Sequence, residues 1–204
     1  MTTYHFEETQ GTENAPLIFT FHGTGGDEQQ FHGIADALIP GSHVISPRGD
    51  VLENGARRYF KRQGCALYDM EDLDQRIAAM SQFVTEAKAR LTPKRVIAIG
   101  YSNGANLITT MAMRHPDLFD DLALLHPMIP WDPAPQPDLA GTRVLIAAGE
   151  RDPICPEVNT RDLMAWFKAQ DCEVYDLWHR GGHEITQAEF AALRTFLQGC
   201  PGCN

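Results

Sequence analysis

Residues 95–106 read Arg95-Val96-Ile97-Ala98-Ile99-Gly100-Tyr101-Ser102-Asn103-Gly104-Ala105-Asn106, an apolar run followed by a serine between two glycines. The β-branched run predicts a strand, and the residues after the serine predict a helix. A sharp turn between them brings strand and helix so close that positions 100 and 104 have almost no room for a side chain. Gly100 and Gly104 meet this requirement. The sequence therefore predicts a strained turn that exposes the Ser102 hydroxyl and leaves the next N–H at a helix N-terminus.

Strand-like and helix-like patterns alternate through most of the chain. Further apolar strands are expected at 17–21, 43–46, 122–125, 143–148 and 174–178, with an edge strand near Tyr4 and Phe6. Helices are expected at about 29–38 and 71–91, after Ser102, from about 156, and after the capping box of Thr186 and Glu189. This alternation predicts an α/β fold in a single domain over residues 1–204, with a mostly parallel, doubly wound sheet and helices on both faces.

Residues 48–70 show neither a strand-like nor a helix-like pattern and are expected to form a long irregular loop. Loops of this length are usually functional or mobile. The loop contains the basic cluster Arg57-Arg58-Tyr59-Phe60-Lys61-Arg62. Because the chain as a whole is acidic, a solvated or substrate-side loop explains this cluster better than a nucleic-acid patch does.

The overall composition is that of an ordinary globular protein with an acidic surface. The chain has 204 residues, 43% of them apolar, and a net charge of −10. Nucleic acids and anionic membranes require a basic face, so neither is expected as a partner, whereas a small molecule is. The first residues lack a signal-peptide pattern and no apolar run reaches the ~20 residues of a membrane span, so neither membrane insertion nor export from the cytoplasm is expected.

The five cysteines, at positions 65, 155, 172, 200 and 203, are scattered and odd in number. This pattern does not fit a disulfide framework, and reduced thiols are expected. Cys200 and Cys203 have the spacing of a redox motif, but they follow a helix instead of starting one, so neither a redox nor a metal role is expected. The sequence calls for no metal and no organic cofactor.

A serine hydroxyl is a weak nucleophile, so Ser102 needs a base that accepts its proton and an acid that orients the base. Three histidines, His126, His179 and His183, follow Ser102 at predicted strand ends. His183 is favoured, because the two glycines before it allow its loop to fold back over the sheet and the helix after it anchors that loop. His179 remains the main alternative.

The orienting acid is expected at a strand end between Ser102 and the base. Asp152 meets this condition and precedes a proline that stiffens its loop, and Glu150, Asp132 and Asp176 remain alternatives.

The oxyanion formed during acyl transfer needs two N–H donors. The N–H of Asn103 is one candidate, and the N–H of Thr24, in the glycine-rich loop after strand 17–21, is the other. His22 is expected to tie this loop to its neighbours.

Several ordered motifs resemble the phospholipase/carboxylesterase family of α/β-hydrolases, in particular its small bacterial carboxylesterases. These motifs are Phe21-His22-Gly23-Thr24-Gly25-Gly26-Asp27-Glu28, Ser46-Pro47-Arg48-Gly49, residues 100–106, Leu125-His126-Pro127-Met128-Ile129-Pro130, Gly149-Glu150-Arg151-Asp152-Pro153-Ile154 and Gly182-His183. The resemblance covers nearly the whole chain. It implies a minimal α/β-hydrolase without a lid domain, a triad of Ser102, Asp152 and His183, and Thr24 and Asn103 as oxyanion donors.

One position departs from the acyl-protein thioesterases of this family, which carry glutamine where this chain has Asn103. A protein thioester is therefore not the expected substrate. Dienelactone hydrolases, another branch, use a cysteine nucleophile where this chain has Ser102.

The function expected from the sequence is that of a serine carboxylesterase acting on small or medium esters through an acyl-enzyme. The substrate pocket is expected to be lined by six apolar or aromatic residues: Tyr59, Phe60, Tyr101, Met128, Ile129 and Trp131. A thioesterase or lysophospholipase of the same family is an alternative, and a ligand-binding protein without turnover is an alternative of another class. The sequence is also compatible with a homodimer.

Overall fold

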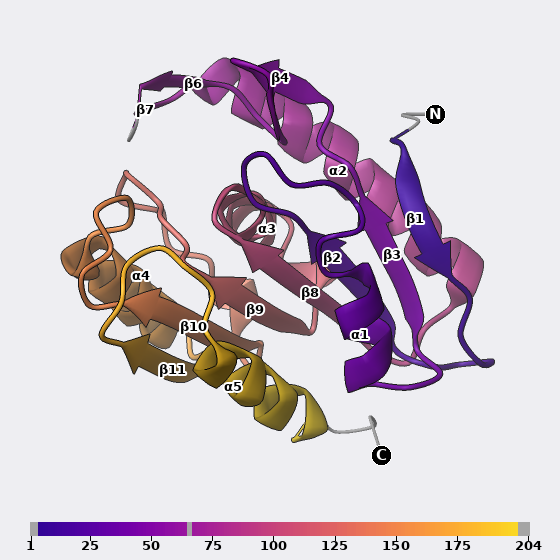
Figure 1. The fold of residues 1–204 in the computed structure, drawn as a ribbon. Helices are drawn as coiled ribbons and strands as arrows, with labels where there is room; N and C mark the ends of the chain where they lie inside the picture. Colours follow the sequence, from indigo (N-terminus) through magenta and orange to yellow (C-terminus); the bar gives the residue numbers. More distant parts are fainter. Residues whose placement is uncertain (1–3, 65–66, 200–204) are drawn as a thin grey trace.

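The computed structural model describes residues 4–64 and 67–199; Cys65 and the terminal pair Cys200 and Cys203 lie outside the described residues. Seven strands form a central sheet in the order β1-β3-β2-β8-β9-β10-β11 (Figure 1). Their bounds are β1 Phe6–Thr9, β2 Leu17–Phe21, β3 His43–Pro47, β8 Val96–Tyr101, β9 Asp121–Leu125, β10 Arg143–Gly149 and β11 Glu173–His179. Only β1, at one edge, runs antiparallel to its neighbour, and the other pairs are parallel. The mostly parallel sheet predicted from the sequence is confirmed.

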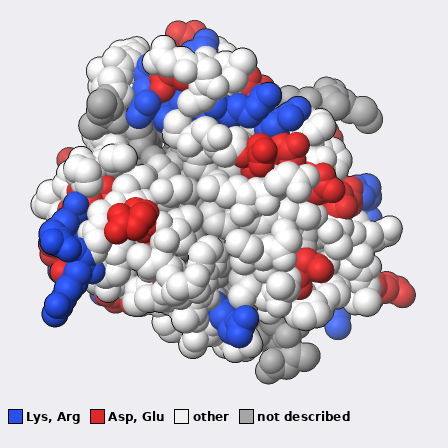
Figure 2. All heavy atoms as spheres, in the orientation of Figure 1, with Lys and Arg blue, Asp and Glu red and all other residues white. Residues whose placement is uncertain are grey.

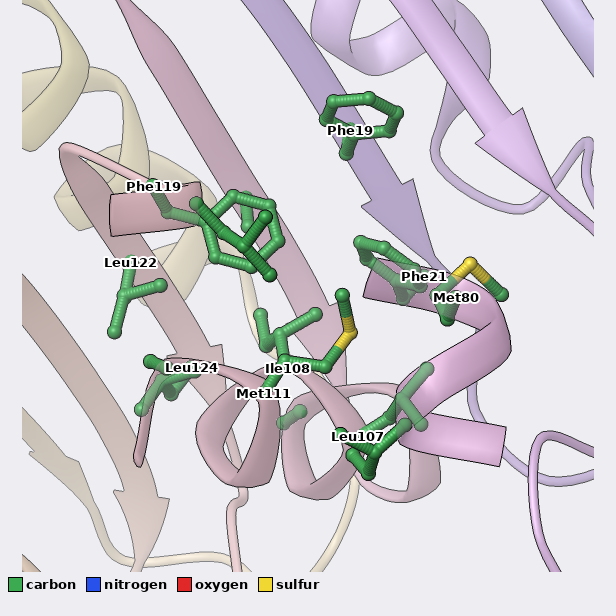
Figure 3. Close-up of a cluster of buried hydrophobic side chains, with 14 of the residues drawn as sticks. Phe19, Phe21, Met80, Leu107, Ile108, Met111, Phe119, Leu122 and Leu124 are labelled. Atoms are coloured by element: carbon green, nitrogen blue, oxygen red, sulfur yellow. The ribbon is translucent and has the colours of Figure 1, made fainter. Parts of the chain in front are cut away.

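The inner strands are mostly apolar on both sides because helices cover both faces of the sheet. On β2, Phe19 and Phe21 face one hydrophobic cluster, whereas Ile18 faces another. Helices α2 Met70–Leu91, α3 Asn103–Arg114 and α4 Glu157–Ala169 cover the first face, and α1 His32–Leu38 and α5 Gln187–Gln198 cover the second. Figure 3 shows part of the first cluster, to which β2 contributes Phe19 and Phe21, α2 contributes Met80 and α3 contributes Met111. The doubly wound arrangement is likewise confirmed.

Local sequence signals set several of the helix ends. The Asp69 side chain caps α2 by accepting the N–H of Asp72, and Thr186 and Glu189 form the predicted capping box of α5. Two short 3₁₀ helices, η1 Pro116–Leu118 and η2 Pro137–Leu139, precede β9 and β10. No helix in the described ranges is long and apolar enough to cross a membrane.

The segment 48–70 is not the irregular loop that the sequence predicted. It contains two antiparallel hairpins, β4 Val51–Glu53 with β5 Ala56–Arg58 and β6 Arg62–Gly64 with β7 Leu67–Tyr68. Asn54 and Gly55 form the first turn with φ of 52° and 81°, the conformation that an Asn-Gly pair favours. Within the described residues, these hairpins are the only secondary structure between β3 and α2, and no lid domain is evident.

A substitution at Gly104 tests how closely α3 packs against the end of β2. A Cβ at this position would lie 2.4 Å from the carbonyl oxygen of Phe21, a backbone atom that cannot move aside. We expect Gly104→Ala to lower the free energy of unfolding in urea by about 1–3 kcal/mol or more. Gly33→Ala in α1, where an added Cβ meets nothing within 4 Å, is the matched control and should stabilise the protein slightly. An unchanged unfolding midpoint for Gly104→Ala would contradict this packing.

Candidate active site

Ser102 occupies the strained turn between β8 and α3. Its backbone has φ 50° and ψ −113°, a conformation that costs a non-glycine residue about 1–3 kcal/mol. The Ser102 N–H donates to the carbonyl of Leu125 at the end of β9, over 2.8 Å. The glycines predicted to permit the turn do so, since a Cβ on Gly100 would lie 2.7 Å from the Ala105 nitrogen. The hydroxyl is thereby fixed at the carboxyl edge of the sheet.

The structure brings Ser102, His183 and Asp152 together from three loops at this edge. The Nε2 atom of His183 lies 2.8 Å from Oγ of Ser102, and its Nδ1 lies 2.6 Å from Oδ2 of Asp152. Because a carboxylate only accepts, Nδ1 carries a proton and Nε2 is free to accept the serine proton. This is the arrangement in which a histidine activates a serine hydroxyl.

Four donors surround the Asp152 carboxylate, whose side chain is fully buried. Oδ1 accepts the N–H groups of Ile154 and Cys155 at 2.8 and 3.0 Å, and Oδ2 accepts Nδ1–H of both His183 and His126. Burial acts to raise the pKa of Asp152, but the hydrogen bonds from Cys155, His183, His126 and Ile154 outweigh it and hold the pKa below its usual value. Asp152 is therefore an anion with both oxygens saturated.

His126 is not a second base for Ser102 but lies behind Asp152, fully buried. Its Nδ1 is 2.9 Å from Asp152, and its Nε2 is 3.0 Å from Oε1 of Glu189, at an angle that does not make a hydrogen bond. Burial acts to lower the pKa of His126, but the carboxylates of Glu189 and Asp152 together raise it above its usual value. His126 thus lies buried between two carboxylates, which favour its protonated form.

Glu189 was predicted only as a capping residue, and the structure gives it a second role. Its Oε2 accepts the N–H of Thr186 at 2.6 Å, while Oε1 faces His126. His179, the alternative base, lies 3.6 Å from Glu189 Oε2 and thus belongs to this rear cluster. Within the described residues, His126 forms two potential cation-binding triples, one with His179 and Glu189 and one with Asp152 and His183. The second triple is the hydrogen-bonded centre itself.

Replacing His126 tests its positive charge. A group whose folded-state pKa is raised stabilises the protein fully below its unfolded pKa, about 6.5, and loses that contribution as pH rises through the folded value. We therefore expect His126→Gln to lower the melting temperature most at pH 6 or below, and progressively less as the pH rises through the folded-state pKa of His126. The exposed His115→Gln is the control and should give a small, constant difference. A pH-independent effect of His126→Gln would show a neutral His126.

The two candidate oxyanion donors flank Ser102. Asn103 is the first residue of α3, so no carbonyl of the helix can accept its N–H. Thr24 lies in the turn after β2, where the Gly26 N–H donates to the Gly23 carbonyl and the Gly25 N–H donates to the carbonyl of Arg57 in β5. Both candidate donors line the cavity in front of Ser102, which fits an oxyanion site.

Two aromatic residues hold the loops around this site. His22 is buried and accepts the Gly49 N–H at Nε2, while its Nδ1 bonds to the Gly23 carbonyl, so it ties loops together as expected. The hydroxyl of Tyr101 donates to the carbonyl of His183 over 2.6 Å and fixes the loop that carries the candidate base.

A cavity of about 330 Å³ opens in front of Ser102. Six of the residues predicted for the site line it: Thr24, Tyr101, Ser102, Asn103, Met128 and His183. The predicted pocket residues Tyr59 and Phe60 are instead fully buried in the core. Ile129 and Trp131 line a separate hollow against α4, with Leu163 and Trp166.

Six lining residues were not predicted: Arg58, Arg62, Tyr68, Asn106, Ile154 and Cys155. The basic cluster was the one sequence signal among them, and the others are isolated positions in the chain. Tyr68 and Asn106 form a buried hydrogen-bonded pair that also holds the Met128 backbone. Burial raises the pKa of the Cys155 thiol, so it is a poor nucleophile beside Ser102.

Comparison with known proteins agrees with this architecture. The family model of the alpha/beta hydrolase fold matches residues 16–142. A Bacillus subtilis (strain 168) protein named "Putative hydrolase MhqD" is 35% identical over 95% of this chain and 97% of its own length. The structure of Atu2452, a protein of unknown function from Agrobacterium tumefaciens str. C58, is 43% identical and superposes with a TM-score of 0.91 over 96% of both chains. The Bacillus cereus carboxylesterase is 32% identical, with a TM-score of 0.87 over 95% of this chain and 92% of its own.

The chain therefore belongs to the α/β-hydrolase family, and it is a hydrolase with carboxylesterases among its structural neighbours.

Proposed function

We propose that this protein is a serine carboxylesterase that cleaves small carboxylic esters through an acyl-enzyme. The observation that carries the proposal is the continuous hydrogen-bonded line from Ser102 Oγ through His183 to Asp152, at 2.8 and 2.6 Å. It lies at the carboxyl edge of the sheet, facing a cavity of about 330 Å³. A cavity of this size suits short acyl and leaving groups better than a long lipid chain.

In the proposed mechanism, Ser102 Oγ attacks the ester carbonyl carbon while His183 Nε2 takes the hydroxyl proton. The N–H groups of Thr24 and Asn103 stabilise the resulting oxyanion, and each such donor typically contributes about 3 kcal/mol to lowering the barrier. The tetrahedral intermediate then collapses, and His183 gives its proton to the departing alkoxide. Water activated by His183 hydrolyses the Ser102 ester and restores the free serine.

Asp152 keeps His183 in the tautomer that this cycle needs, and His126 keeps Asp152 in place. The free thiols of Cys155 and Cys172 fit a reducing compartment such as the cytoplasm.

The direct test measures turnover of a matched substrate panel by the purified protein. The panel compares 4-nitrophenyl acetate with 4-nitrophenyl decanoate, and each oxygen ester with its thioester. We expect the highest kcat/KM for the short oxygen ester. A preference for thioesters or long chains would favour the thioesterase or lysophospholipase alternative, and ligand binding without any turnover would favour a non-enzymatic role.

A further inference from the structure

Arg58 gives the candidate active site a positive charge that the proposed ester chemistry does not use. It ends β5, and although its side chain is only 3% exposed, it lines the cavity in front of Ser102. Its Nη1 donates to Oγ1 of Thr24 over 2.6 Å, and its Nε donates to the carbonyl of Phe60 over 3.3 Å. The guanidinium is thus held beside the residue whose N–H we assign to the oxyanion.

The charges around Arg58 do not cancel. Glu53 is the neighbouring carboxylate, and Arg62 occupies it with two bonds, from Nε at 2.9 Å and from Nη2 at 2.7 Å. Arg58 Nε lies farther from Glu53, at 3.7 Å. Two arginines therefore share one carboxylate, which leaves one net positive charge. Burial and the charge of Arg62 lower the pKa of Arg58 to about 10, so it remains a cation at neutral pH.

Among the described residues, no acidic side chain lines the cavity. Asp152 lies behind His183, and its oxygens are saturated by four donors. Figure 2 shows Lys and Arg atoms gathered over the β4–β7 region of a molecule whose net charge is −10. The cavity is thus a local site of positive charge.

Two residues that line this cavity, Asn103 and Arg58, carry a side-chain donor without an acceptor among the described residues. The side-chain nitrogen of Asn103 is buried and has no hydrogen-bond partner among residues 4–64 and 67–199. Its oxygen accepts the N–H of Tyr59 over 2.7 Å, so the amide cannot turn to exchange its ends without losing that bond. Arg58 Nη2 likewise has no acceptor among these residues, because the bonds of the guanidinium are made by Nε and Nη1. A buried donor without a partner is costly until a ligand supplies an acceptor.

We propose that the physiological substrate is a small ester that carries a carboxylate, and that this carboxylate binds Arg58 beside the ester group being cleaved. The inference rests on the proposed esterase function and specifies its substrate class. A carboxylate matches a planar guanidinium with free N–H groups, and a monoanion matches the single net charge better than a phosphate dianion does. Half-esters of short dicarboxylic acids and acylated hydroxy acids both meet this description and fit the cavity.

The test compares two pairs of esters in which a neutral group of similar size replaces the carboxylate. In the first pair, ethyl hemiglutarate is compared with ethyl 5-methylhexanoate, in which an isopropyl group replaces the carboxylate. In the second, 4-acetoxybenzoate is compared with 4-acetoxyacetophenone. We expect the anionic member to have about 10- to 100-fold higher kcat/KM in at least one pair. Equal or lower values for the anion in both pairs would overturn the inference.

Three variants separate substrate binding from a structural role of Arg58. Arg58→Gln should bring the anion-to-neutral ratio of kcat/KM close to one, and Arg58→Lys should restore part of it. Arg57→Gln, which removes a neighbouring arginine outside the cavity, should leave the ratio unchanged. If Arg58 only supported Thr24, Arg58→Gln would slow both esters equally and the ratio would persist, which would contradict carboxylate binding.

The same experiments distinguish this inference from the proposed function. Hydrolysis of 4-nitrophenyl acetate without any preference for anions would refute the substrate class and leave the esterase intact. If no ester is hydrolysed, titration calorimetry with the monoanion ethyl hemiglutarate tests the Arg58 site alone. Wild-type protein should then bind ethyl hemiglutarate at least tenfold more tightly than Arg58→Gln does, and equal affinities would overturn the site.

Discussion

Asp152→Asn is expected to lower kcat for a short ester by about 10⁴-fold while KM changes little. The reason lies in the four donors around this side chain. The N–H groups of Ile154 and Cys155 donate to Oδ1 of Asp152, so in the variant they would bind the amide oxygen at that position. The amide nitrogen would then take the place of Oδ2 and face both histidines. His183 would have to accept at Nδ1 and carry its proton on Nε2. In that tautomer it could no longer take the proton of Ser102.

Steady-state kinetics of Asp152→Asn should be compared with two control variants, Glu150→Gln and Asp176→Asn. These remove two of the three acids that the sequence left as alternatives, and both are exposed in the structure. We expect the controls to keep nearly wild-type kcat. If Asp152→Asn retains more than about a tenth of the activity, or if a control loses as much, Asp152 is not the orienting acid.

Ser102→Ala should lower kcat by about 10⁵- to 10⁶-fold, because no nucleophile remains at the turn. The fold should be unaffected. The Ser102 N–H still donates to the Leu125 carbonyl, and among the described residues the side chain makes a hydrogen bond only to His183. Kinetics and thermal melting of the same preparation check both statements. Residual activity within tenfold of wild type, after exclusion of contaminating enzymes, would show that another group attacks the ester.

Much of the fold could be predicted because its determinants are local. Leu17–Phe21 is apolar at every position except Thr20, and this nearly continuous pattern predicts a strand covered on both faces. The capping box at Thr186 depends on residues three apart, and it was equally predictable. The hairpins in 48–70 were missed because their strands are two or three residues long, too short for a periodic pattern. The Asn54-Gly55 pair was the available signal for the first one.

The candidate site was predictable where topology decides position, since the carboxyl ends of parallel strands meet at one edge. Ser102, Asp152 and His183 all follow such ends. The contact of His126 with Glu189 joins residues far apart in the sequence, and no local pattern encodes it. Tyr59 and Phe60 were expected in the pocket as aromatic loop residues. The Tyr59 hydroxyl instead bonds to the buried Pro47 carbonyl, and the neighbouring Arg58 lines the cavity.

The central claim is that Ser102 forms the covalent acyl-enzyme. A fluorophosphonate that mimics the tetrahedral intermediate should label the purified protein, with intact mass and peptide mapping as the readout. We predict one adduct per chain, located on Ser102, with activity lost in proportion to labelling and no adduct on Ser102→Ala. Full modification of Ser102 with activity retained, or stoichiometric labelling at another residue, would contradict the account.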